Sequence, residues 1–196
     1  RLQMIEKIVL TDADGVLLDW EVDFNKWMAK HGYEKKVSGV YAMEIAYELP
    51  KVECKKLVRE FNSSAWVRYL PAFRDARSGV AHLVEAGYTF HCITSLSLDE
   101  KAAQLRKRNL EAIFGKGVFT EIVCLDTGAD KDEALEKYKD SGLYWIEDKT
   151  QNANLGQTLG LKSILIDHVH NKEDVTNKGV VRVGNWAQIV DIIANV

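Results

Sequence analysis

The sequence predicts an α/β fold in which a mainly parallel, doubly wound sheet carries an inserted helical segment. Six short apolar runs are typical of strands, and several are apolar at successive positions, as in strands covered on both faces. Amphipathic helical patterns lie between most of these runs. About 70 residues separate the first run from the second, far more than one crossover helix requires. We therefore expect a Rossmann-like sheet with strand order 3-2-1-4-5-6 and a small helical cap.

Each element of this fold has its own signal in the sequence. The predicted strands cover residues 7–13, 88–95, 121–126, 143–148, 162–167 and 179–183. Helical spacing of apolar residues predicts helices over residues 76–86, 98–110, 130–140, 150–159 and 186–194. Gly87 is a suitable C-terminal cap for the first of these helices. Ser97, followed three residues later by Glu100, predicts a capping box at the start of the second.

The long interval after the first predicted strand is predicted to fold as a separate helical domain. Helical patterns cover residues 24–31, 41–48, 51–61 and 65–69. We expect a cap domain over residues 19–71 and a core domain made of residues 1–18 and 72–196. The cap leaves the carboxyl end of the first strand, and ligands of open α/β sheets bind beyond such ends. The cap is therefore expected to cover whatever site lies there.

Composition excludes several classes of function. The chain has 196 residues, 46% of them hydrophobic, which is enough for one domain with a sizeable core. A net charge of −3 gives no broad basic face for a nucleic-acid polymer, and no apolar stretch is long enough to span a membrane. Cys54, Cys92 and Cys124 lie far apart and are expected to be reduced thiols, which favours a cytoplasmic location. The oligomeric state is left open.

The most informative residues follow the first strand. Asp12 and Asp14 come directly after the apolar run 8–10, and Gly15 permits a turn there. Two carboxylates at the end of a buried strand are costly unless a cation compensates them. An ordinary aspartate-rich turn is the alternative interpretation of this pattern alone.

Polar residues suited to the same chemistry follow three other strands. Thr94 and Ser95 end the second strand, Lys131 follows the third, and Glu147 and Asp148 end the fourth. A parallel sheet brings these ends to one edge. Carboxylates and a backbone carbonyl suit Mg²⁺, whereas a hydroxyl and an ammonium suit phosphoryl oxygens.

In these motifs the sequence resembles the haloacid dehalogenase (HAD) superfamily. The run 12–16 is similar to its first motif, Thr94 to the second, Lys131 to the third, and Glu147 with Asp148 to the fourth. The resemblance extends over nearly all of the core, and the cap position matches members whose insert lies between the first two motifs. It implies a Mg²⁺-dependent phosphomonoester hydrolase that acts through an aspartyl-phosphate.

The resemblance also implies a role for each residue. Asp12 is the nucleophile, and Asp14 protonates the leaving oxygen and then takes a proton from water. Asp12, the backbone carbonyl of Asp14 and Asp148 hold Mg²⁺, with Glu147 acting through a metal-bound water. Thr94 and Lys131 hold phosphoryl oxygens. One departure is Asn152, which stands where many relatives carry an acid and is expected to support the loop or a metal-bound water.

The cap is expected to set substrate specificity. Phe24, Trp27 and Trp66 are candidates to stack on a nucleobase, with formation of the cap's own core as the alternative. The stretch 61–73, followed by Thr94 and Ser95, is similar to the 5′(3′)-deoxyribonucleotidases. The expected substrate is thus a small phosphorylated molecule, with a nucleoside monophosphate first and phosphoglycolate or a sugar phosphate as alternatives.

Other interpretations remain. A phosphomutase of the same superfamily would return the phosphoryl group to another hydroxyl, and a HAD fold without activity would serve as a binding module. The pair His168 and His170 is expected to be a surface loop, since no further Cys or His completes a metal site. The run Arg106-Lys107-Arg108 is expected to be the solvated face of a helix.

Overall fold

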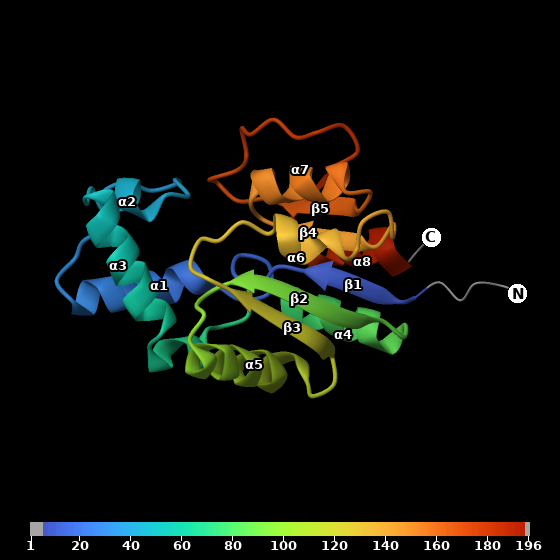
Figure 1. The fold of residues 1–196 in the computed structure, drawn as a ribbon, viewed down its shortest axis with the longest axis horizontal. Coiled ribbons are helices and arrows are strands. Elements are labelled where there is room, and N and C mark those ends of the chain that lie inside the picture. The colour runs from blue at the N-terminus through green and yellow to red at the C-terminus, as the bar shows by residue number, and fades with distance from the viewer. Residues whose placement is uncertain (1–5, 195–196) are drawn as a thin grey trace, which may run out of the picture.

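The computed structural model describes residues 6–194 and contains one six-stranded sheet (Figure 1). Every pair of neighbouring strands is parallel, and the order is β3-β2-β1-β4-β5-β6. This confirms the predicted fold class and strand order. The strands are β1 (Ile8–Thr11), β2 (Thr89–Ser95), β3 (Phe119–Leu125), β4 (Tyr144–Glu147), β5 (Lys162–Ile166) and β6 (Val181–Val183).

The continuous apolar runs are explained by burial on both faces of the sheet. Val9 and Leu10 are neighbours in β1 and are both fully buried, yet they belong to two different core clusters. Successive side chains of a strand point to opposite faces, so each face needs its own cover. Helices α4 (Ala76–Glu85), α5 (Glu100–Phe114) and α8 (Trp186–Ala194) supply the cluster of Val9, and α6 (Asp132–Glu136) and α7 (Thr150–Thr158) supply that of Leu10.

Several helix boundaries differ from the prediction, and α5 continues to Phe114 instead of ending at residue 110. The predicted capping box at Ser97 is wrong, because Asp99 is the N-cap of α5 and accepts a hydrogen bond from the Lys101 N–H at 3.0 Å. A carboxylate is favoured there over a hydroxyl because it also interacts with the helix dipole. The helix predicted over 130–140 is shorter: α6 ends at Glu136, and turns continue to residue 140.

The interval between β1 and α4 folds into helices, as its patterns predict. These are α1 (Trp20–Lys30), α2 (Met43–Ala46), α3 (Lys51–Asn62) and the 3₁₀ helix η1 (Ala65–Tyr69). Figure 1 shows α1, α2 and α3 beside the sheet, on the side to which the arrowheads of β1 and β2 point. We refer to residues 19–71 as the cap.

The two chain connections to the cap lie side by side. Leu18 forms an antiparallel bridge with Ala72, and the Asp19 N–H donates to the Pro71 carbonyl at 2.8 Å. On the other side of the bridge, the Phe73 N–H donates to the Leu17 carbonyl at 2.9 Å. The chain therefore leaves the core and returns to it at the same place.

Over residues 6–194, no helix has both the length and the apolar character that crossing a membrane would require.

Candidate active site

The sheet topology brings the predicted site residues to one edge. Asp12 directly follows β1, which lies between β2 and β4. Thr11 is paired with Cys92 of β2 and with Ile146 of β4, so Thr94 and Glu147 end up on either side of Asp12. Lys131 precedes α6 and reaches the same edge from the loop after β3. Alternating strands and helices are sufficient to produce this convergence.

Lys131 is the central cation of the site. Its Nζ lies 2.8 Å from Asp12 Oδ1 and 2.7 Å from Glu147 Oε1, and the residue is almost fully buried. The ammonium also lies over the Trp145 ring, 5.2 Å from its centroid. Burial alone would lower the pKa of Lys131, but the carboxylates of Asp12 and Glu147 raise it above its usual value. The lysine is therefore firmly cationic.

Glu147 holds Lys131 in place. Oε1 accepts hydrogen bonds from Lys131 and from the side-chain amide of Asn152, and Oε2 accepts from the backbone N–H groups of Asp148 and Lys149. Four donors satisfy the acceptor capacity of a carboxylate. These donors, Lys131 foremost, overcome the cost of burial and lower the pKa of Glu147. Asn152 thus supports Glu147 directly.

Negative charge is in excess at this edge. The carboxylates of Asp12, Glu147 and Asp148 have oxygens within 4.8 Å of one another, against the single ammonium of Lys131. Burial, followed by the charge of Glu147, raises the pKa values of both Asp12 and Asp148 well above the usual range. An oxygen-rich cluster short of positive charge fits a hard divalent cation such as Mg²⁺. Asp12 and Asp148 are the members whose oxygens are less fully hydrogen-bonded.

Asp14 is paired with a buried arginine that the sequence did not indicate. Arg106 of α5 is fully buried, and its Nη1 and Nη2 lie 2.8 and 3.0 Å from Oδ1 and Oδ2 of Asp14. The prediction that the run 106–108 faces solvent is therefore wrong for Arg106. The spacing of residues along the helix could have revealed this burial, because Arg106 lies four residues from both Ala102 and Leu110 on the buried side of α5.

The two hydroxyl residues of β2 have different environments. Thr94 is fully buried, and its Oγ1 accepts a hydrogen bond from Arg106 Nη1 at 3.4 Å. Ser95 donates to the Ala129 carbonyl at 2.9 Å and so fixes the loop that carries Lys131. Arg106 therefore contacts both Thr94 and Asp14.

The cap aromatics pack against one another. Phe24 is fully buried and Trp27 is 6% exposed, and both contact Phe61 with ring centroids 5.4 and 5.8 Å apart. Trp66 is half-buried at the edge of this group, with its centroid 6.4 Å from that of Phe61. Phe24 thus offers no surface to a ligand, and Trp66 is the most accessible of the three predicted substrate contacts.

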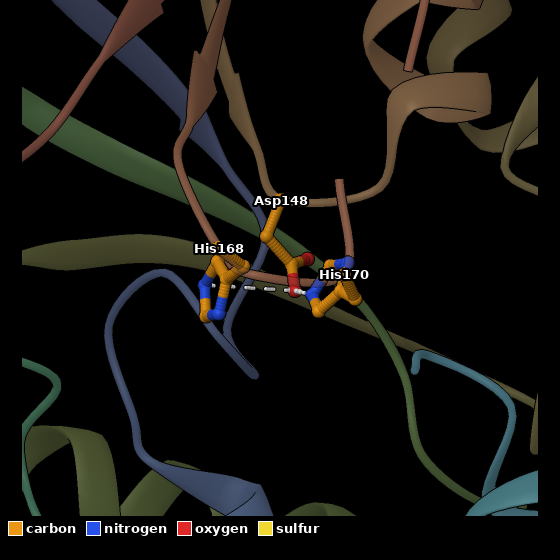
Figure 2. A group of neighbouring side chains, drawn as sticks. All are labelled: Asp148, His168 and His170. Carbon is orange, nitrogen blue, oxygen red and sulfur yellow. Dashed lines mark ion pairs between the residues drawn. The ribbon is translucent and has the colours of Figure 1, made fainter. Parts of the chain in front are cut away.

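His168 and His170 converge on Asp148, as Figure 2 shows. Their Nε2 atoms lie 3.9 and 3.4 Å from Asp148 Oδ2. Burial lowers the pKa values of both imidazoles. Tyr41 of the cap lies edge-on to His170, with centroids 5.1 Å apart, so the cap contacts this group. Sequence spacing gave no sign of this arrangement, because Asp148 comes from another strand end.

Gly15 makes the close approach of these groups possible. It has φ of +77°, and a Cβ there would lie 2.8 Å from Asp148 Cγ and 3.4 Å from His168 Nε2. We expect Gly15→Ala to displace Asp148 and to abolish Mg²⁺ binding, measured by calorimetry. Gly32→Ala is the matched control, because Gly32 has φ of +84° with nothing within 4 Å of the added carbon. Equal Mg²⁺ affinities of the two variants would contradict the expectation.

The chain is similar to known proteins mainly in its fold. No protein-family model matches it. A relative by sequence is an uncharacterised 32.4 kDa protein from the Gp30–rIII intergenic region of Enterobacteria phage T4. The two are 29% identical over an alignment of 194 residues, and the alignment covers 92% of this chain and 67% of that protein.

Solved structures match along almost the whole chain. A predicted phosphoglycolate phosphatase from Haemophilus somnus 129PT has a TM-score of 0.67 at 13% identity, over 97% of this chain and 99% of that one. A HAD-superfamily hydrolase from Ehrlichia chaffeensis has a TM-score of 0.56 at 14% identity, over 97% of each chain. D,D-heptose 1,7-bisphosphate phosphatase from B. bronchiseptica, in complex with magnesium and phosphate, has a TM-score of 0.59 at 12% identity, over 96% and 98%. The chain therefore has the fold of the haloacid dehalogenase superfamily hydrolases.

Proposed function

We propose that the chain is a Mg²⁺-dependent phosphomonoester hydrolase that works through an aspartyl-phosphate on Asp12. The observation that carries this proposal is the contact of Lys131 with both Asp12 and Glu147 at the carboxyl edge of a HAD-type sheet. A buried ammonium beside a carboxylate nucleophile reduces the repulsion between that carboxylate and an anionic phosphoryl group. A module that merely binds a partner would have no need of this arrangement.

The reaction takes two steps. In the first, a carboxylate oxygen of Asp12 attacks phosphorus, the bond from phosphorus to the ester oxygen breaks, and Asp14 gives its proton to that leaving oxygen. In the second, Asp14 takes a proton from water, which attacks the same phosphorus and releases phosphate from Asp12. Lys131 offsets negative charge in both steps, and the Thr94 hydroxyl is proposed to contact a phosphoryl oxygen.

The residues present fit a resident Mg²⁺. Asp12, Asp148 and the backbone carbonyl of Asp14 would hold it, and Glu147 would act indirectly through Lys131 and the surrounding hydrogen bonds. The ion would supply positive charge to the transferring phosphoryl group and to the crowded carboxylates. The fold neighbour from B. bronchiseptica is in complex with magnesium and phosphate, which supports this assignment.

A small sugar phosphate or phosphoglycolate is the substrate class that we favour. A nucleobase needs an exposed aromatic face, whereas Phe24 and Trp27 pack into the cap core. Trp66 and the half-exposed Tyr41 are cap aromatics with surface available to a substrate, and a nucleoside monophosphate would depend on residues of this kind.

The test is phosphate release from a panel of phosphomonoesters with Mg²⁺ or with EDTA. The panel contains phosphoglycolate, sugar phosphates and deoxynucleoside 5′- and 3′-monophosphates. We expect Mg²⁺-dependent release that is fastest for the small acid and sugar phosphates. Turnover concentrated on nucleotides would keep the chemistry and replace the substrate class. Turnover that is unchanged in EDTA, or transfer between hydroxyls of one substrate without release, would contradict the proposed reaction.

A further inference from the structure

His168 and His170, which lie beside Asp148, take no part in the chemistry proposed above. One nitrogen from each imidazole and one oxygen of Asp148 all lie within 4.8 Å of one another (Figure 2). The side chains of all three residues are at least 86% buried. Two imidazoles and a carboxylate that meet in a sheltered place form a set of ligands that a transition metal can use.

Hydrogen bonding does not explain the contact between His170 and Asp148. The distance of 3.4 Å between Nε2 and Oδ2 is longer than that of a charge-assisted hydrogen bond. It matches the spacing of roughly 3.3–3.6 Å between two donor atoms that share one tetrahedral ion at bond lengths near 2.1 Å. The distance of 3.9 Å from His168 to the same oxygen needs a small closing movement to reach that spacing.

The loop that carries both histidines is held in place by buried polar contacts. Asn171 is 1% exposed, and its Nδ2 donates to the carbonyls of Asp148 at 2.7 Å and Ile166 at 2.9 Å. Its Oδ1 accepts from the His168 N–H at 3.0 Å. Asn171 therefore joins the Asp148 backbone to the histidine loop directly. Arg182 of β6 donates to the Asn171 carbonyl at 3.0 Å and secures the other side.

Ring packing orients the first histidine. The imidazole of His168 lies between Phe73 and His170, with ring centroids 4.8 and 4.7 Å away and planes within 22° of parallel. Its Nε2 lies 2.7 Å from the Gly15 carbonyl oxygen. To bind an ion, Nε2 gives up the proton that it shares with this carbonyl, so the ion replaces this hydrogen bond. Because the two imidazoles are stacked, one ring turns about its Cβ–Cγ bond when both nitrogens bind a single ion.

We propose that Asp148, His168 and His170 bind a transition-metal dication of the Zn²⁺ or Co²⁺ type, and that this site shares Asp148 with the Mg²⁺ site. Imidazole ligands favour such ions, whereas Mg²⁺ prefers oxygen ligands alone. Since one carboxylate serves both sites, an ion at the histidines withdraws Asp148 from the acidic cluster. Transition metals and Mg²⁺ are therefore expected to antagonise each other.

The test uses the visible absorption of Co²⁺ titrated into the metal-free protein, and no turnover is required. We expect one strong site in the wild type and at least about a tenfold loss of Co²⁺ affinity in His170→Asn and in His168→Asn. His82→Asn is the matched control, because His82 is an exposed histidine on α4. Thermal unfolding of each variant checks the fold, and His170→Asn preserves the test if His168→Asn unfolds.

A second variant separates this proposal from the proposed function. Asp12→Asn weakens the acidic cluster and leaves both histidines unchanged, so we expect it to keep Co²⁺ affinity within about threefold of the wild type. Co²⁺ affinity that falls in Asp12→Asn and stays constant in both histidine variants would overturn the proposal. Because the readout is absorption, the result stands whether or not the protein releases phosphate.

Discussion

Asp12→Asn is expected to lower kcat for Mg²⁺-dependent phosphate release by at least about 10³-fold while leaving the fold intact. An amide oxygen is too weak a nucleophile to attack phosphorus, and its nearly identical shape preserves the packing around Lys131. Loss of the proposed nucleophile should lower kcat itself, because Glu147 is the one other carboxylate beside Lys131 among the described residues. The oxygens of Glu147 already accept four hydrogen bonds.

The same substitution should not destabilise the protein. Burial and the charge of Glu147 raise the pKa of Asp12, so the folded state disfavours this negative charge. Such a carboxylate lowers stability above its unfolded pKa, and an uncharged amide removes that cost. We expect a Tm at pH 7 equal to or above that of the wild type. Retention of activity within tenfold of the wild type would refute the role of Asp12.

A matched control is available next to Lys131. Asp130→Asn makes the same chemical change at an exposed residue that lies outside the acidic cluster. Its kcat and Tm should both be close to those of the wild type. Steady-state phosphate release and calorimetric unfolding of the three proteins at one Mg²⁺ concentration complete the comparison.

The pair formed by Asp14 and Arg106 predicts an asymmetric effect on stability. Asp14→Asn leaves the guanidinium of Arg106 fully buried without its counter-charge, and should lower the free energy of unfolding by about 3–5 kcal/mol. Arg106→Met removes the buried charge instead. The side chain of Asp14 is 23% exposed and gains partial hydration, so the loss should be smaller, about 1–2 kcal/mol.

Urea unfolding at pH 7 measures these effects. The double variant Asp14→Asn/Arg106→Met should recover part of the stability lost in Asp14→Asn, because no unpaired charge remains. Arg108→Met is the control on the same helix, since Arg108 is exposed, and it should change the unfolding free energy by less than about 0.5 kcal/mol. A loss in Asp14→Asn no larger than in Arg108→Met would show that the buried pair contributes nothing.

This pair also bears on catalysis. Arg106 engages both carboxylate oxygens of Asp14, so a proton on Asp14 takes one of the lone pairs that Arg106 does not use. Asp14→Asn removes the proposed proton donor and should lower kcat by about 10²-fold or more. Arg106→Met keeps that donor and should retain more activity than Asp14→Asn.

The fold and the convergence of the motifs could be predicted because they depend on local patterns. Continuous apolar strands report burial on both faces, and a parallel sheet necessarily gathers its carboxyl ends. Asp12 and Glu147 could therefore be placed together from the strands that precede them. Their separation in the sequence did not matter once the topology was known.

Features that depend on the direction of a side chain could not be predicted from the sequence. Arg106 belongs to a run of three charged residues, a pattern that predicts exposure to solvent, yet its own side chain faces the core. Phe24 has the same sequence pattern whether it lines a pocket or fills a core. The meeting of His168 with Asp148 depends on a loop whose path is set by Asn171. In each case the decisive contact is tertiary.

The shared base of the cap has an evolutionary consequence. Leu18 and Ala72 form a bridge, and the Cα atoms of residues bridged in this way lie about 5 Å apart. A two-residue hairpin turn can close a gap of this size. An insert attached at such a point can grow, shrink or be exchanged without altering the register of a single strand. A change of insert can thus alter what covers the carboxyl edge of the sheet while the strands keep their pairing.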